Sequence, residues 1–362
     1  MTAPLSKLPV WLSQYRRGLM LALLLAALLA AIAYPHVMRI YFVTLAVDIL
    51  IYAMFAMSLD LILGYTGLPS FGHAAFFGLG AYLLAYLTTR LAMNNLLVTA
   101  PAVLLGAALM ALVIGFFALR TRGVYFLMVT LAFAQMLYSV AINWSAVTGG
   151  SDGLAGVPRP AIGLGPLSFA FKSRESFYYL ILVSFLLVWW LLRRIVNSPF
   201  GWALRGIREN EARMRALGYN TFRFKMAAFV IAGALAGLAG LLFAHSQFVA
   251  SPENLYWTTS GQVMIMLIVG GAGTLSGPIF GAATVRLLRN YVSSATDRWE
   301  TLMGVVFILF VLFARRGIVG LFASAWRRLA APEADTAKAS GDMPQHAAAP
   351  SASQNAPHEA VK

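Results

Sequence analysis

The stretch IYFVTLAVDILIYAMFAMSLDLIL, which runs from Ile40 to Leu63, decides the class of protein to which this chain belongs. It is almost entirely apolar, and its only charged side chains are those of Asp48 and Asp60. A membrane-spanning helix needs about 20 consecutive, predominantly apolar residues, so the stretch predicts such a helix. Carboxylates inside a membrane are costly and usually face the protein interior or a water-filled cavity. We expect both to pair with a buried arginine or with helix ends; ion coupling is the alternative.

The rest of the chain repeats this apolar pattern. Of its 362 residues, 60% are hydrophobic and 11% are charged, and the mean hydropathy is +0.75. Soluble globular chains carry about 25% charged residues, so most of this protein's surface must face lipid. The other apolar runs are Leu19–Ala33, Phe71–Leu87, Leu96–Leu119, Val124–Ile142, Phe177–Leu192, Phe224–Ala244, Gln262–Leu288 and Leu302–Phe313. Together they predict an all-α polytopic membrane protein with about nine apolar segments.

The basic residues predict the orientation of these segments. The net charge of +14 comes from Lys and Arg residues at the ends of the apolar runs, as in the cytoplasmic loops of membrane proteins. We expect a cytoplasmic N-terminus at 1–18, a transmembrane domain at 19–316 with a cytoplasmic loop at 193–223, and a cytoplasmic tail at 317–362 that is disordered from about 331. The first run could instead be a signal peptide, but the many later spans favour a retained helix.

Several function classes are excluded or disfavoured by the composition. No basic, aromatic domain lies outside the apolar spans, which argues against nucleic-acid binding. The chain has no Cys, and its five His residues are far apart, which argues against a metal site and a disulfide framework. No paired acid and base lies at membrane depth, so a membrane-embedded enzyme is disfavoured. The phosphate-binding pattern G-x-x-x-x-G-K-[ST] is absent, so this chain does not hydrolyse ATP itself.

The eighth apolar run is interrupted by a glycine-rich stretch, GGAGTLSGP, from Gly270 to Pro278. Glycine and proline at this density break a helix, and a broken backbone at membrane depth is tolerated only where it is buried in protein or lines a cavity. Two short helices folded as a hairpin would place the basic C-terminal side in the cytoplasm. They would also bring Arg286 and Arg289 towards the outer side. A single kinked helix is the alternative.

The cytoplasmic loop contains a predicted amphipathic helix. Ser198 and Pro199 are typical of a helix start, and Gly218 supplies a stop. Between them one face carries Ala203, Ile207, Asn210, Met214 and Leu217, with Leu204 beside it. Such an apolar stripe needs a surface to cover it. A helix lying on anionic lipid is one interpretation; docking of a cytoplasmic protein is the other, favoured by Glu209 and Glu211 because acids oppose anionic lipid.

Four stretches, taken in order, resemble branched-chain amino acid ABC transporter permeases of the LivM type. They are GYTGLPSFGHAAFFG at Gly64–Gly78, TGGSDGL at Thr148–Leu154, SPFGWALRGIRENE at Ser198–Glu211 followed by ALGYN at Ala216–Asn220, and WTTSG at Trp257–Gly261 followed by Gly270–Pro278. The resemblance covers about residues 40 to 320. Gln262 departs from it, because glutamate is expected there, and no Leu-Pro pair follows Gly218.

The resemblance implies a subunit of an ATP-driven importer. Its partners would be a second, LivH-like membrane permease, two cytoplasmic ATPase subunits and a periplasmic or extracellular solute-binding protein, within the bacterial inner membrane and with both termini cytoplasmic. ATP and Mg would be used by the ATPases, with no cofactor in this chain. Leucine, isoleucine and valine are the expected substrates. Urea or short amides, nucleosides, and an ion-coupled secondary transporter are the alternatives; the long basic loop argues against the last.

The resemblance also implies three groups of site residues. The ATPase-coupling group is Ile207, Arg208, Glu209, Asn210, Glu211, Met214 and Gly218. The translocation-pathway group is Ser70, Gly72, His73, Gly270, Gly271, Gly273 and Thr274. The group expected to dock the binding protein is Gly149, Gly150, Ser151 and Asp152. No catalytic or metal-binding residue is expected.

Overall fold

A computed structural model of the chain describes residues 29–164 and 167–295, together with Ala26, Thr301, 304–305, Ile308 and 317–320. The chain divides into two units, Met1–Leu321 and Phe322–Lys362, and the described residues all belong to the first. The expected cytoplasmic N-terminus at 1–18 and the expected tail from 331 lie outside the described residues. So do most of the runs Leu19–Ala33 and Leu302–Phe313.

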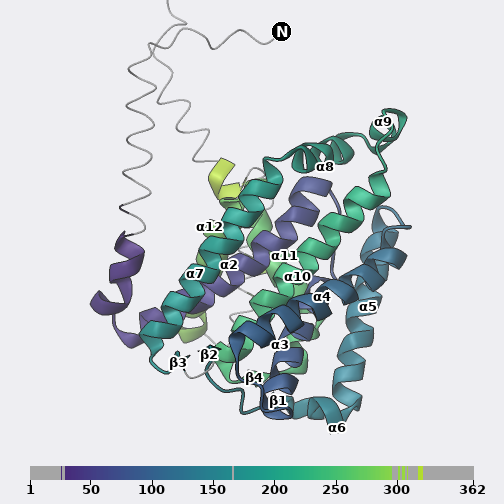
Figure 1. Cartoon of the computed structure of the whole chain (residues 1–362). Coiled ribbons are helices and arrows are strands. Elements are labelled where there is room, and N and C mark those ends of the chain that lie inside the picture. Colours follow the sequence, from purple (N-terminus) through teal and green to yellow (C-terminus); the bar gives the residue numbers. More distant parts are fainter. Residues whose placement is uncertain are drawn as a thin grey trace, which may run out of the picture. The chain divides into compact units, whose positions relative to one another are not determined.

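Each of the other seven apolar runs forms helical structure, as predicted (Figure 1). The helices are α2 (Ile40–Thr66), α3 (His73–Thr89), α4 (Leu96–Ala118), α5 (Val124–Asn143), α7 (Arg174–Val196), α10 (Thr221–Gln247), α11 (Trp257–Gly270) and α12 (Gly277–Ala295). Five of them, α2, α4, α5, α7 and α10, are long and apolar enough to cross a membrane, whereas α11 is shorter. The protein is therefore a multi-span helical membrane protein.

Short strands in the loops were not predicted. Strand β1 (Leu154–Ala155) pairs antiparallel with β4 (Val249–Ala250), and β2 (Ala161–Leu164) pairs with β3 (Leu167–Ala170). Strands this short leave no alternating pattern in a sequence rich in glycine and proline. The β1–β4 pair joins the connection between α5 and α7 to the one between α10 and α11. It lies at the end of the helices opposite to α8 (Pro199–Glu209) and α9 (Glu211–Ala216) (Figure 1).

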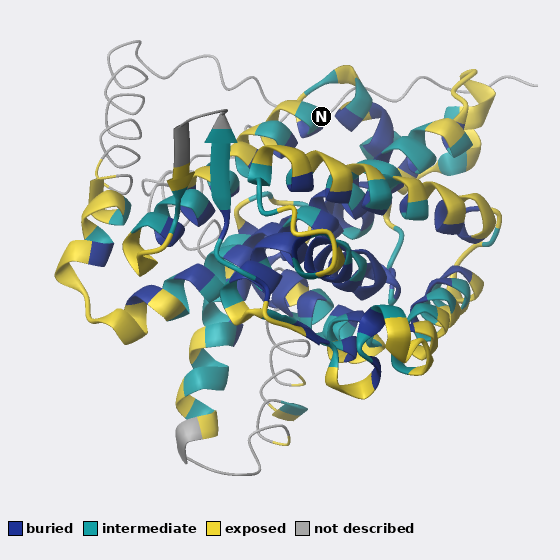
Figure 2. Cartoon of the chain, turned by 60° about the horizontal axis from the view of Figure 1, so that its bottom comes forward, coloured by how far each residue is buried: buried dark blue, intermediate teal, exposed yellow. Residues whose placement is uncertain are grey.

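Helix α2 is largely buried in the helical unit, whose buried residues gather in its interior (Figure 2). From Ile51 to Ile62 every residue is buried, because α2 packs against α7, α10, α11 and α12. Large apolar side chains on outer helices, such as Leu105 and Leu109 of α4, are exposed. A contiguous exposed apolar surface of this kind suits a lipid environment rather than water. The stretch Ile40–Leu63 thus forms the helix against which α7, α10, α11 and α12 pack, while α3 and α4 pack mainly on α10.

Helices α3 and α10 are held together by glycines that let their backbones touch. A Cβ on Gly240 would lie 1.8 Å from the carbonyl oxygen of Phe77, and one on Gly80 would lie 2.1 Å from that of Gly237. Small residues permit this close approach, which drives helix association in membranes. The glycines of α10 thus form a packing surface for α3.

The eighth run is two helices folded back on one another. A Cβ on Gly281 of α12 would lie 1.8 Å from the carbonyl oxygen of Met266 of α11, and one on Gly270 would lie 1.9 Å from that of Gly277. In a single continuous helix, residues 266 and 281 would be about 22 Å apart, at 1.5 Å per residue. The geometry therefore favours the hairpin over the kinked helix.

Replacing Gly240 with Ala tests the close packing of α3 and α10. The added methyl group must push the helices apart, and we expect a loss of about 1–3 kcal/mol of stability, as for overpacked cores. Thermal unfolding in detergent, followed by size-exclusion chromatography, measures the effect. Gly261→Ala is the matched control, because a Cβ there meets nothing closer than 3.8 Å. Equal unfolding temperatures for the two variants would contradict the prediction.

Candidate functional site

The loop at 193–223, which was expected in the cytoplasm, forms two helices, and the prediction of one helix from Pro199 to Leu217 is wrong. Helix α8 ends at Glu209, and α9 begins at Glu211. Asn210 between them is extended, with φ −157° and ψ 95°, and its side-chain oxygen accepts a hydrogen bond from the amide of Arg213 at 2.9 Å. Asparagine is among the best N-cap residues, so it starts a second helix here. The predicted stop at Gly218 is confirmed by its φ of +87°.

The apolar stripe of this loop is covered by the chain itself. Leu204 and Ile207 are buried, Ile207 with 4% exposure, because α8 packs against α2, α7 and α10. Met214 folds back onto α8: a Cβ on Gly206 would lie 2.7 Å from its sulfur. The stripe expected to face a lipid surface or a partner is therefore largely internal. Trp202, Leu217 and Tyr219 are the large apolar side chains that the loop leaves exposed.

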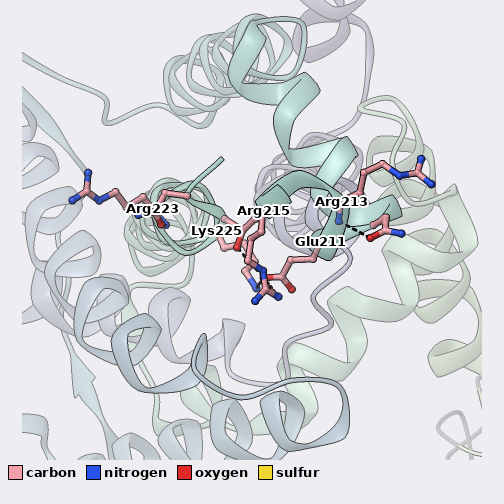
Figure 3. A network of polar contacts seen from close by, with 8 residues as sticks. Glu211, Arg213, Arg215, Arg223 and Lys225 are labelled. Atoms are coloured by element: carbon pink, nitrogen blue, oxygen red, sulfur yellow. Dashed lines mark hydrogen bonds and ion pairs between the residues drawn. The ribbon is translucent and has the colours of Figure 1, made fainter. Parts of the chain in front are cut away.

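Glu211 ties α9 to the start of α10 (Figure 3). Its Oε1 accepts hydrogen bonds from Lys225 Nζ at 2.8 Å and Thr221 Oγ1 at 3.0 Å, and Arg215 lies 3.5 Å away. Burial raises the pKa of Glu211, but the hydrogen bonds and charges of these partners outweigh it and hold the pKa below its usual value. Glu209 is exposed. Of the two acids expected to favour docking, one therefore has an internal role.

Three of the sequence motifs meet at one point, where α8 crosses the end of α2. Arg208 donates a hydrogen bond through Nη1 to the carbonyl of Gly64. One turn earlier in α2, Oδ1 of buried Asp60 accepts from the amide of Gly273 at 2.7 Å. A Cβ on Gly273 would lie 3.1 Å from Arg208 Nη1. The cytoplasmic loop, the end of α2 and the glycine-rich break thus share one cluster, which we call the Arg208 cluster: Asp60, Gly64, Arg208 and Gly273.

The glycine-rich break is a tight turn that only glycine can make. Gly271 and Gly273 have φ of +113° and +81°, which side chains rarely permit. Thr274 closes the turn: its hydroxyl donates to the Gly271 carbonyl at 2.7 Å and accepts from the Gly277 amide at 3.2 Å. Several polar groups of the break, including the amides of Gly273 and Gly277 and the carbonyl of Gly271, are thus bonded within the protein, as a membrane requires.

The start of α3 lies in a buried polar contact between helices. Ser70 accepts from the amide of Gly72 at 3.2 Å, but the helix starts at His73, so Ser70 does not cap its first turn. That cap comes from Ser260 of α11, which accepts from the Ala74 amide at 2.7 Å. Nε2 of His73 is hydrogen-bonded to Oγ of Ser58 in α2 at 2.8 Å.

Ser58 and Ser260 were missed by sequence reasoning. Each is a polar residue within or beside an apolar run, and this position could have identified it as a candidate for a buried polar contact. In hydrocarbon such residues must find internal partners.

Asp48 pairs with Arg286 of α12, which is one of the pairings expected for it. The guanidinium of Arg286 also lies 4.2 Å from the ring centroid of Tyr52. Arg286 approaches the N-terminal half of α2, the half expected to lie towards the outer side, and Asp48 compensates its charge there. Among the described residues, no group of three or more His, Asp or Glu side chains could hold a metal ion.

The glycine-rich loop that was expected to dock the binding protein forms a short turn at the end of the helices opposite to α8 (Figure 1). Gly149 and Gly150 have positive φ, and a Cβ on Gly149 would lie 2.1 Å from the Gly153 carbonyl oxygen. Ser151 and Asp152 are exposed. The structure does not bring this loop together with the Arg208 cluster, which lies at the other end of α2.

Comparison with known proteins identifies the family. Residues 41–314 match the family described as "Branched-chain amino acid transport system / permease component". The chain is 29% identical over 317 residues to the high-affinity branched-chain amino acid transport system permease protein LivM of Salmonella typhimurium, which covers 82% of this chain and 74% of the relative. The corresponding LivM protein of Escherichia coli gives the same identity and coverage. A probable branched-chain amino acid transport permease protein LivM of Methanocaldococcus jannaschii is 25% identical over 64% of this chain and 75% of the relative. No solved structure matches.

The family match extends over most of the chain and includes every described helix from α3 to α12 together with nearly all of α2. This protein belongs to the family of permease components of branched-chain amino acid transport systems.

Proposed function

We propose that the chain is one of two membrane subunits of an ATP-driven importer of leucine, isoleucine and valine. It lies in the bacterial cytoplasmic membrane with both termini in the cytoplasm. A second, LivH-like permease completes the pathway, and two ATPase subunits bind on the cytoplasmic side. A solute-binding protein delivers the amino acid to the outer face, where Gly149, Gly150, Ser151 and Asp152 form part of its docking surface.

The observation that carries this proposal is the Arg208 cluster. An importer of this kind must convert movement of the ATPases into movement of membrane helices. Helix α8 lies at the end of the bundle and contacts α2 directly, and its Arg208 holds the same turn of α2 that holds the glycine-rich break. A displacement of α8 therefore reaches the break through two hydrogen bonds. The break, with Ser70, Gly72 and His73 at the start of α3, is our candidate pathway.

Charge supports the proposed orientation. A cavity of about 520 Å³ is lined by Arg120 and Arg122 from the α4–α5 connection and by Arg215 of α9 and Lys225 of α10, both of which pair with Glu211 at the same cavity. Two basic loops that are separate in sequence thus meet on the side of the membrane that carries α8 and α9. Excess Lys and Arg are typical of cytoplasmic loops, and they suit a partner with acidic side chains.

The exposed side chains identify the docking residues better than the apolar stripe does. Leu217 is 67% exposed at the end of α9. Leu217→Asp should weaken ATPase binding by about tenfold or more, because a carboxylate would be desolvated in the interface. Surface plasmon resonance with the purified ATPases measures the affinity. Ile207→Asp is the contrasting variant: Ile207 is buried in this chain, so its loss should lower the unfolding temperature of the permease itself. Wild-type affinity in the Leu217 variant would count against docking at α9.

Proteoliposomes separate ATP-driven import from ion coupling. The isolated chain, given a proton or sodium gradient, should accumulate no leucine, whereas adding the second permease, the ATPases, the binding protein and ATP on the loop side should start uptake. Asp48→Asn should destabilise the protein without changing the energy source, since it leaves Arg286 unpaired. Labelled urea and nucleosides serve as substrate controls. Gradient-driven accumulation by the isolated chain would overturn the importer.

A further inference from the structure

A second feature of the structure lies at the outer end, away from the Arg208 cluster. The guanidinium of Arg159 lies between two aromatic rings, 4.3 Å from the ring centroid of Phe177 and 4.6 Å from that of Phe248. Its Nη1 also donates to the carbonyl of His245 at 3.5 Å. Stacking on two rings fixes the plane of a guanidinium. Arg159 is therefore held in one orientation, with donors beyond the one that His245 uses.

The backbone at Phe248 is strained to make this arrangement. Phe248 has a φ of +62°, a left-handed conformation that is uncommon for a bulky residue. Its carbonyl accepts hydrogen bonds from the amides of Gly156 and Val157 at 3.0 and 3.1 Å, which hold the strained residue in place. Strain of this kind concentrates at functional sites, and here it positions the ring against Arg159.

Arg159 opens onto a cavity of about 260 Å³. One wall is apolar and includes Val43, Val47 and Phe177; the cavity is also lined by the polar Thr44 and Gln247. Arg174, at the start of α7, also lines it. The cavity thus combines an apolar wall with two guanidinium groups, in a volume below the usual range for drug-sized ligands.

Within the described part of the chain, no ion pair neutralises the positive charge of the cavity. Neither Arg159 nor Arg174 forms an ion pair with a carboxylate among the described residues. Burial and the nearby charge of Arg174 lower the pKa of Arg159. Two like charges beside a partly desolvated cavity favour an anionic ligand, and a planar guanidinium matches a carboxylate in geometry.

We propose that this cavity binds an aliphatic amino acid at the outer face, with its α-carboxylate on Arg159 and Arg174 and its side chain against Val43, Val47 and Phe177. This assignment rests on the proposed function and adds to it a binding site on the permease, outside the glycine-rich break. The site receives the amino acid from the binding protein before the pathway opens. A lipid phosphate shares the anionic chemistry, and the experiment below distinguishes it.

Thiol protection tests the site, because the chain has no native Cys. Gln247→Cys places a thiol at the cavity, and its rate of labelling by a charged methanethiosulfonate reagent is measured in the assembled transporter in phosphatidylcholine vesicles. Leucine at several times its Kd should slow labelling about fivefold. Leucinamide, which lacks the carboxylate, should leave the rate unchanged. Labelling that is equally fast with and without leucine would overturn the proposal.

Charge variants identify the groups responsible. Arg159→Gln should raise the leucine concentration needed for protection about tenfold or more, since a hydrogen bond to a charged group is lost. Arg174→Gln should also raise the leucine concentration needed for protection. Because Arg174 is exposed, this variant is expected to fold normally, so it serves as a control if Arg159→Gln does not fold. Lys172→Gln removes an exposed charge close by in sequence and should change nothing. Full protection by leucine in both arginine variants would refute the assignment.

Two further arms separate the remaining outcomes. If anionic phosphatidylglycerol slows labelling without leucine, and Arg159→Gln abolishes that effect, the cavity binds lipid phosphate and the amino-acid assignment is wrong. ATP-driven leucine uptake is measured in the same vesicles. Uptake without protection overturns the cavity site alone, whereas protection without uptake overturns the proposed importer and leaves the site intact.

Discussion

The hydrogen bond from the amide of Gly273 to Oδ1 of Asp60 fixes the position of the broken eighth segment. A backbone without helical hydrogen bonds cannot be left in hydrocarbon, because each unsatisfied group costs several kcal/mol. Asp60 meets this requirement for the Gly273 amide from the last turns of α2, where its side chain is fully buried. The approach leaves no room for a side chain at Gly64, where a Cβ would lie 1.9 Å from the same carboxylate oxygen. Gly64 and Gly273 thus allow α2 and the break to approach closely enough for this hydrogen bond to form.

The same constraint connects the two ends of the mechanism. Because α2 must hold the break at Asp60, whatever moves the cytoplasmic end of α2 also moves the break. Arg208 donates a hydrogen bond to the Gly64 carbonyl at that end of α2. Helix α8, which carries Arg208, packs on the bundle through its buried side chains Leu204 and Ile207. At the outer end, the β1–β4 pair and the strained Phe248 hold Arg159 in place. We propose that the amino acid binds a rigid surface at the Arg159 end of the bundle. The ATPases act on the opposite end, through α8.

The sequence predicted the described apolar helices because hydrocarbon allows few alternatives. A run of about 20 apolar residues can cross the membrane only as a helix, unless it is part of a closed barrel. A glycine-rich stretch within such a run predicts that the helix is interrupted. It also predicted that Asp48 would pair with a buried arginine or with helix ends, and Asp48 pairs with Arg286, which is mostly buried. It did not predict that Ile207 packs against other helices of this chain. The apolar face of an amphipathic helix shows that a partner must cover it, but not whether that partner is part of the same chain. Nor could it identify Arg159, whose significance depends on Phe177 and Phe248, which are distant in sequence from each other.

The most direct test of the central claim is the number of ATP molecules hydrolysed per leucine transported by Arg208→Gln in the reconstituted transporter. If the Arg208–Gly64 contact transmits the movement of α8, the variant should hydrolyse ATP at close to the normal rate but import much less leucine, so the ratio rises. Arg213→Gln, on exposed α9, should keep the wild-type ratio. An unchanged ratio in the Arg208 variant, with normal uptake, would show that the movement reaches the break by another route.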